Sequence, residues 1–187
     1  MNKKFIAYPI IIIILFSAGC GKMLKKNPER GAVPPDLSKL VEMKAVDAAY
    51  NQESHNYLFH LEAAEEKMAG IVLPIYVGER EASVLSMKLN RQSTPRPLTH
   101  DLLLNMVNAL GGQIKHVVVE ELRDNVYLAR IYMTDKNGIL HSVDSRASDA
   151  IILGVATGTK LHFSKEVVRK GAAAPAPKAA PAGGWNL

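Results

Sequence analysis

Two carboxylates, an arginine and two hydroxyl groups fall within six consecutive positions of this chain: Asp144, Ser145, Arg146, Ser148 and Asp149. The pattern before Asp144 predicts a short strand that ends there, and the pattern after it predicts a helix. Carboxylates can bind a divalent cation and an arginine can clamp a phosphate, so this strand-to-helix corner is a candidate functional site. The alternative is structural: Ser145 or Ser148 caps the first helical turn, and Asp149 complements the helix dipole.

The predicted helix should lie against a sheet. Ile151, Ile152 and Val155 form one apolar stripe along it. Gly154 lies inside the helix, where glycine costs about 1 kcal/mol relative to alanine. We therefore expect a close approach of another element at Gly154.

The composition indicates one folded domain with appendages. The chain has 187 residues, of which 48% are hydrophobic and 22% are charged. Its formal net charge is +5, or +3 if Lys3 and Lys4 are removed with an N-terminal segment (5 − 2 = 3), which weakly favours polyanion binding. The single cysteine, Cys20, excludes an intramolecular disulfide and a cysteine-based zinc site.

The N-terminus resembles a bacterial lipoprotein signal. Two lysines precede a run of five isoleucines at positions 10–14, and small residues precede Cys20. We expect residues 1–19 to be a signal peptide and Cys20 to be lipidated, which would place the domain outside the cytoplasm, anchored to a membrane. Ser17 stands where the pattern usually has leucine, so an uncleaved N-terminal anchor is the alternative.

The two segments that flank the predicted domain are rich in residues that do not build a hydrophobic core. We expect residues 20–36 to be a flexible tether and the Ala/Pro-rich residues 171–187 to be disordered, with Trp185 idle or docked on the domain. The folded domain should span residues 37–170.

Within that domain, strand patterns cluster at the beginning and again in the middle, with helical patterns between and after them. Pro74 lacks an N–H group, which predicts an edge position or a bulge for its strand, and Thr99 is the predicted N-cap of a helix with Asp101 in its first turn. The fold class is therefore α+β, a single domain with a mixed, mainly antiparallel sheet and three to four helices packed on it. The predicted strands are 40–46, 57–63, 70–77, 115–122, 126–134, 139–143 and 160–163, and the predicted helices are 79–90, 99–110, the segment after the Asp144 corner, and 165–170.

Three stretches carry a family resemblance. They are Leu73–Ala82 (LPIYVGEREA), Pro95–Leu103 (PRPLTHDLL) and Asp144–Ile151 (DSRASDAI). Their order and spacing resemble the bifunctional nuclease domain family over about residues 37–170. One departure is Ala147, which stands where the family commonly has proline.

The resemblance implies cleavage of RNA and DNA, with nucleic acid as partner. We expect little sequence preference, and a homo-oligomer stays open. The alternative is a non-catalytic envelope lipoprotein that uses the same fold for protein binding or assembly. Phosphodiester cleavage needs an activated water and a positive charge near the phosphate, and a divalent ion such as Mg²⁺ or Mn²⁺ supplies both.

Residue chemistry then suggests individual roles. The candidate metal ligands are Asp144 and Asp149, with Glu79 and Glu81 as further oxygen donors. Each acidic residue also has a structural interpretation, since the two glutamates could form the solvated first turn of a helix.

The remaining candidates would act on protons and phosphate. His100 could be the general base or acid, and Arg96 and Arg146 could bind the phosphate. In the structural interpretation His100 faces solvent and Arg96 holds its proline-rich loop. The tyrosines Tyr76, Tyr127 and Tyr132 fall in strand patterns, so we expect them to be packed rather than displayed to bases.

Overall fold

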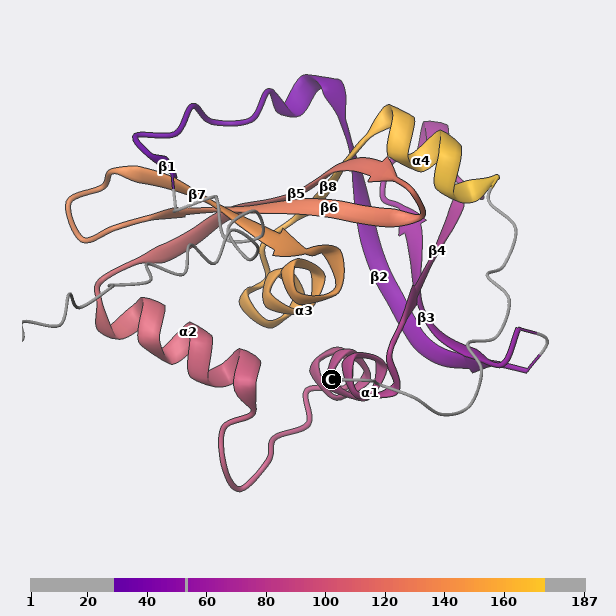
Figure 1. Cartoon of the computed structure of the whole chain (residues 1–187), viewed down its shortest axis with the longest axis horizontal. Coiled ribbons are helices and arrows are strands. Elements are labelled where there is room, and N and C mark those ends of the chain that lie inside the picture. The colour runs from indigo at the N-terminus through magenta and orange to yellow at the C-terminus, as the bar shows by residue number, and fades with distance from the viewer. Residues whose placement is uncertain (1–28, 53, 174–187) are drawn as a thin grey trace, which may run out of the picture.

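The described strands form one eight-stranded sheet in the order β1-β7-β6-β5-β8-β2-β3-β4 (Figure 1). The computed structural model describes residues 29–52 and 54–173. Neighbouring strands are antiparallel except β5 and β8, which are parallel, so the sheet is mixed and mainly antiparallel as predicted. The strands are β1 Glu29–Arg30, β2 Leu40–Asn51, β3 Asn56–Ala63, β4 Val72–Val77, β5 Gln113–Arg123, β6 Val126–Thr134, β7 Leu140–Arg146 and β8 Leu161–Ser164.

Four α-helices accompany this sheet in the described residues. Helices α2 and α3 lie on one side of the β5–β7 half of the sheet, α1 packs against α3, β2 and β3, and α4 packs against β4 and β5 (Figure 1). The α+β prediction is confirmed. The helices are α1 Glu79–Leu89, α2 Thr99–Ala109, α3 Ala147–Thr157 and α4 Lys165–Ala172, and two short 3-10 turns are η1 Leu37–Lys39 and η2 Glu66–Met68.

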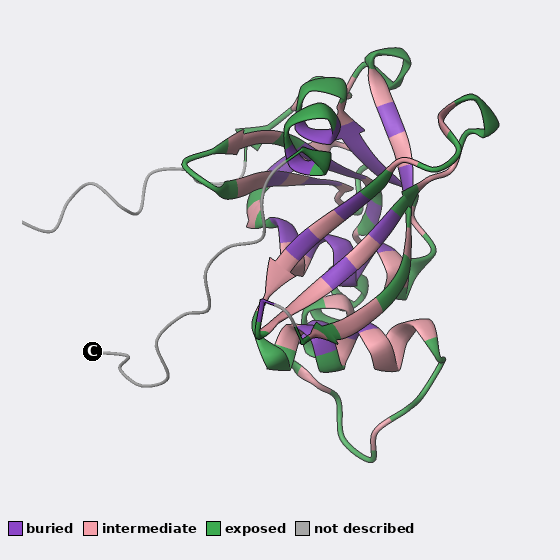
Figure 2. Ribbon diagram, turned by 90° about the vertical axis from the view of Figure 1, so that its right-hand side faces the viewer, coloured by how far each residue is buried: buried purple, intermediate pink, exposed green. Residues whose placement is uncertain are grey.

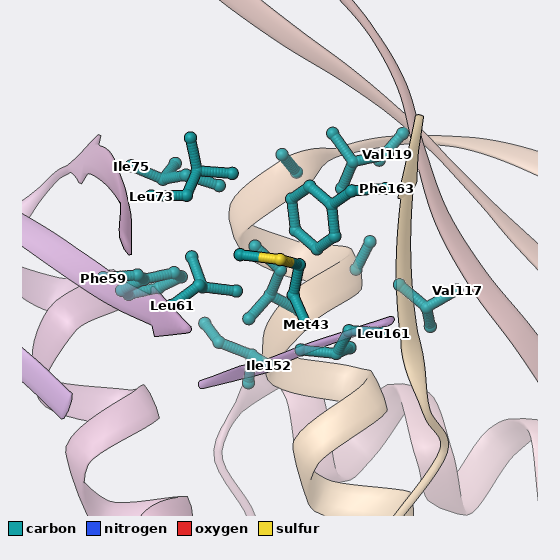
Figure 3. Close-up of a cluster of buried hydrophobic side chains, with 14 of the residues drawn as sticks. Met43, Phe59, Leu61, Leu73, Ile75, Val117, Val119, Ile152, Leu161 and Phe163 are labelled. Carbon is teal, nitrogen blue, oxygen red and sulfur yellow. The ribbon is translucent and has the colours of Figure 1, made fainter. Parts of the chain in front are cut away.

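A hydrophobic core joins the two halves of the bent sheet to α3. Met43, Leu61, Leu73, Ile152 and Phe163 are essentially inaccessible to solvent and converge in it (Figure 3). Buried segments run along the strands and the inner faces of the helices, while the connecting turns are exposed (Figure 2). The core fixes the position of α3 and therefore of its N-terminal end.

Two local predictions are confirmed by the sheet and by α3. Strand β4, which contains Pro74, is the last strand of the sheet and thus an edge strand. A Cβ atom added at Gly154 would overlap Leu161 and lie 3.3 Å from a Val117 methyl group, so glycine permits the close approach of α3 to β5 and β8.

The predicted helix caps are wrong. Helix α2 begins at Thr99, and its N-cap is Leu98, whose backbone N–H donates to Asp101 (3.2 Å). Strand β7 continues through the predicted corner to Arg146, which is itself the N-cap of α3 and caps it with no side-chain hydrogen bond. At α2, the carboxylate of Asp101 bonds the first backbone N–H group in place of a Thr99 hydroxyl cap. At α3, pairing of β7 with β6 continues to Arg146, so Ser145 lies in the strand and cannot cap the helix.

The first predicted strand is too short for a different reason. Strand β2 runs to Asn51 because a bulge between Ala45 and Asp47 shifts the side-chain alternation without ending the pairing with β3. The described part of the predicted tether also joins the sheet, since Glu29 and Arg30 pair with Ser142 and His141 of β7.

Several predictions fall on residues outside the described ranges. They are the signal peptide, the lipidation of Cys20, most of the tether and the tail with Trp185. None of the helices in residues 29–52 and 54–173 is long and apolar enough to cross a membrane.

Candidate functional site

Arg146 is the centre of a polar network at the end of β7. Its Nε donates to Oδ2 of Asp149 (2.6 Å) and its Nη2 donates to Oδ1 (2.8 Å), so the pair is bidentate. On the other side its Nη1 lies 3.1 Å from Oε1 of Glu81 in α1. The Arg146 side chain is nevertheless 66% exposed, so part of the guanidinium remains available to a ligand from solvent.

His100 brings a third element to this network. Its Nε2 lies 3.1 Å from Oδ1 of Asp149, across a separation of 49 residues in the chain. His100 is the buried residue of α2, and its side chain is 11% exposed. The solvent-facing interpretation of His100 is therefore wrong: the pair joins the first turn of α2 to the first turn of α3.

The network fixes the charge of its central carboxylate. Burial opposes ionisation of Asp149, but hydrogen bonds from Arg146 and His100 outweigh it and lower the pKa of Asp149 below its ordinary value. The hydrogen bond with Asp149 in turn raises the pKa of Arg146, despite partial burial. Because the carboxylate is ionised, it accepts the Nε2–H of His100, so Nδ1 is the ring nitrogen that can accept a proton.

Three hollows meet at Arg146. A groove of about 830 Å³ runs between α1 and α2 and is lined by Glu79, Arg80, Glu81, Ser83, Val84, Met87, Leu98, Thr99, His100, Leu103, Arg146 and Asp149. An apolar hollow of about 440 Å³ lies between α2, α3 and the sheet. A third, of about 550 Å³, lies where the end of β4, the β5–β6 turn and the start of α3 come together. We call these the helix groove, the apolar hollow and the strand-end hollow.

The other predicted site residues are placed differently. Asp144 is exposed on β7 and lines the strand-end hollow and the apolar hollow. Glu79 lines the helix groove and lies beside Tyr57, whose pKa is raised by burial and by the Glu79 carboxylate. Arg96 is exposed on the α1–α2 loop, where its carbonyl accepts from Thr94, and it lines none of the three hollows. The structure thus unites Glu81, His100, Arg146 and Asp149 and leaves Asp144, Glu79 and Arg96 apart.

The acidic residues in this arrangement do not fit a divalent cation. Across residues 29–52 and 54–173, no three His, Cys, Asp or Glu side chains gather as metal ligands would. Both oxygens of Asp149 are engaged, and the positive guanidinium of Arg146 lies between Asp149 and Glu81, where it would repel a metal ion. The metal-ligand roles stay predictions, and the geometry describes an ion-pair network built on arginine.

The residues that sequence reasoning missed lie in the strand-end hollow. Tyr76 and Tyr127 are half-buried and line it, together with Asn125 of the β5–β6 turn. Tyr127 also packs against the hydrophobic core and Tyr132 is buried, both as expected. A signal existed for Tyr76, which lies inside the first of the three recognisable stretches. None existed for Tyr127, because only the bend of the sheet brings β6 to the end of β4.

Comparison with known proteins gives consistent matches. The model of the bifunctional nuclease domain family matches residues 62–175, from the end of β3 onwards. An uncharacterized protein of Mycobacterium tuberculosis, found in strains CDC 1551 and H37Rv, is 30% identical over 96 residues, covering 51% of this chain and 56% of that protein. "Bifunctional nuclease 2" of Arabidopsis thaliana is 28% identical over 103 residues, covering 54% of this chain and 31% of that protein. The chain therefore matches about half the length of the mycobacterial relatives and less of the plant one.

Proposed function

The chain belongs to the bifunctional nuclease domain family, and on that premise we propose that it hydrolyses phosphodiester bonds of RNA or DNA at the Arg146 network. The observation that carries the proposal is the His100–Asp149–Arg146 arrangement at the end of the helix groove. It combines a histidine oriented by a carboxylate with an exposed arginine, which are the groups that proton transfer and phosphate binding require.

In the proposed reaction Arg146 binds the scissile phosphate. Its exposed edge donates to the non-bridging oxygens, while Asp149 and Glu81 hold the guanidinium in place. The negative charge that develops on the phosphorus oxygens in the transition state then lies against a fixed positive charge. Because more negative charge falls on these oxygens in the transition state than in the ground-state strand, the guanidinium should bind the transition state more strongly.

His100 handles the proton. Nδ1 accepts a proton from the attacking water as its oxygen bonds to phosphorus, and Asp149 stabilises the imidazolium through Nε2–H. The same proton then passes to the leaving oxygen as its bond to phosphorus breaks, giving a phosphate monoester and a free hydroxyl.

The test is cleavage of end-labelled single-stranded RNA and DNA by the purified chain, with and without a chelator. His100→Asn should lower the rate by about a hundredfold or more, which is the range for general acid–base catalysis. The matched control is His141→Asn, because His141 forms the same kind of pair with Asp135 (3.1 Å) at the other end of β7. Equal rates in the two variants would refute the role of His100, and loss of activity with chelator would restore the metal hypothesis.

The extracytoplasmic, membrane-anchored location is part of the same proposal. It is supported by the lipoprotein-like segment before Cys20, and its test is fatty-acid labelling of the chain in cells. In this location the substrate would be nucleic acid outside the cytoplasm.

One observation favours the second candidate, a protein-binding role without catalysis. Helix α2 exposes an apolar stripe and adjoins the apolar hollow, an arrangement that a second copy of the chain could cover in a homo-oligomer. Sedimentation velocity should then show an oligomer that Met106→Ser dissociates and Val126→Ser, an exposed change elsewhere, does not. The stripe consists of Leu102, Leu103, Met106 and Leu110.

A further inference from the structure

The strand-end hollow has the lining of a site for a flat, polar-edged ring. Strands β4 and β6 are separated by four strands in the sheet, yet the bend of the sheet (Figure 1) brings Tyr76 and Tyr127 to line the same hollow. The pKa of Tyr127 is raised by burial and by the neighbouring Tyr76, which agrees with their proximity. Ile75 and Val126 add apolar surface. Such walls suit the face of an aromatic ring system.

Polar groups lie at the same hollow. Asn125 occupies the two-residue β5–β6 turn, where Asp124 and Asn125 both have positive φ (50° and 61°), so the backbone that carries the amide is held in a tight turn. The amide of Asn125 can donate and accept, and the exposed carboxylate of Asp144 can accept. Together they can pair with the N–H groups and acceptors along the edge of a nucleobase.

The hollow also adjoins the position assigned to the phosphate. Arg146 and Glu81 line both the strand-end hollow and the helix groove, so the two spaces adjoin at these residues. A base in the hollow therefore places its own phosphate beside Arg146. The volume of about 550 Å³ lies in the range of small-molecule sites.

We propose that the strand-end hollow binds one unpaired nucleobase of the substrate, stacked against Tyr76 and Tyr127, with the adjoining phosphate on Arg146. The inference rests on the proposed nuclease function and narrows its substrate. A base inside a duplex is stacked on both faces and cannot enter, so the substrate is a single strand or an unpaired nucleotide.

The experiment measures binding separately from cleavage. The full chain is titrated calorimetrically with AMP, CMP and ribose 5-phosphate, which carries the phosphate without a base. AMP and CMP should bind about tenfold or more tightly than ribose 5-phosphate, as expected for base–aromatic stacking. Tyr76→Leu should abolish that difference, whereas Tyr50→Leu, which changes an exposed strand tyrosine that lines none of the three hollows, should keep it.

The cleavage assay then separates the two proposals. Nucleotide binding that depends on Tyr76, in a chain that cleaves no strand, would support the base site and refute the nuclease. Cleavage with equal binding of ribose 5-phosphate and AMP, or equal rates on a single strand and a duplex of the same sequence, would overturn the base site and leave the nuclease standing. Circular dichroism checks the fold of each variant. Tyr127→Phe tests the second wall with the aromatic ring retained, and it should keep the preference for AMP over ribose 5-phosphate. Loss of that preference in Tyr127→Phe would overturn stacking as its cause.

Discussion

Replacing Asp149 by asparagine distinguishes the three interpretations of the Arg146 network. The change preserves side-chain size and removes the charge that accepts from Arg146 and His100. The Arg146 contacts involve a largely exposed side chain and should contribute about 0.5 kcal/mol. The His100 contact is mostly shielded, with side chains 11% and 25% exposed, and should contribute about 1 kcal/mol. We therefore expect a loss of about 1–2 kcal/mol in the free energy of unfolding at pH 7, together with loss of cleavage.

The pH dependence of this loss has a definite sign. The folded-state pKa of Asp149 is lowered below its ordinary value of 3.8, so its ionised form stabilises the folded protein above that value. The stabilisation disappears as the pH falls through the depressed folded-state pKa. The difference in stability between the wild type and Asp149→Asn should therefore be full at pH 7 and shrink at strongly acidic pH.

The assay combines urea unfolding, followed by circular dichroism, with cleavage of a labelled strand. Asp135→Asn is the matched control, because Asp135 pairs with His141 and its side chain is similarly exposed, at 28%. Asp135 also accepts from the backbone N–H groups of Asn137 and Ile139, so this variant should lose stability too while cleaving normally.

Two outcomes would refute the reasoning. Unchanged or increased stability of Asp149→Asn with loss of activity would indicate repulsion between carboxylates, as a metal site predicts. Unchanged stability and unchanged activity would indicate that the contacts of Asp149 with Arg146 and His100 contribute neither to folding nor to cleavage, and would end the catalytic role of this residue.

Further expectations concern packing, protonation and anchoring. Gly171→Ala should cost about 1–3 kcal/mol in a thermal or urea unfolding experiment, because the added methyl group would overlap Leu73 and lie 2.5 Å from the Tyr127 hydroxyl; an unaffected midpoint would show that α4 can shift. The Nδ1 of His162 is buried without a hydrogen-bond partner among the described residues, and burial lowers the pKa of His162, so stability should fall as the pH drops below the ordinary value of 6.5. His162→Leu should reduce that decline, and an unchanged pH profile would contradict this. Cys20→Ser should abolish fatty-acid labelling and leave a precursor of higher mass, whereas equal labelling would exclude lipidation at this residue.

The local pattern of the sequence was sufficient for most of the fold. Strand patterns in the sequence identified β3, β5, β6 and β7, and the apolar stripe with Gly154 identified α3 and its close packing on the sheet. These features depend on neighbours within about one turn or one strand, where side-chain direction follows directly from backbone geometry. The end of β2 was missed because a bulge reverses the alternation without ending the strand.

The candidate site was decided mainly by tertiary structure. The sequence identified Arg146 and Asp149, which are three residues apart and meet within one helical turn. It could not reveal that His100 bonds Asp149, that Glu81 holds the other side of Arg146, or that Tyr76 and Tyr127 line one hollow. Those contacts depend on the bend of the sheet and the packing of α1 and α2 beside α3. Of the four acidic residues that the sequence grouped as metal ligands, Asp149 and Glu81 pair with Arg146, whereas Asp144 is exposed on β7 and Glu79 lies beside Tyr57.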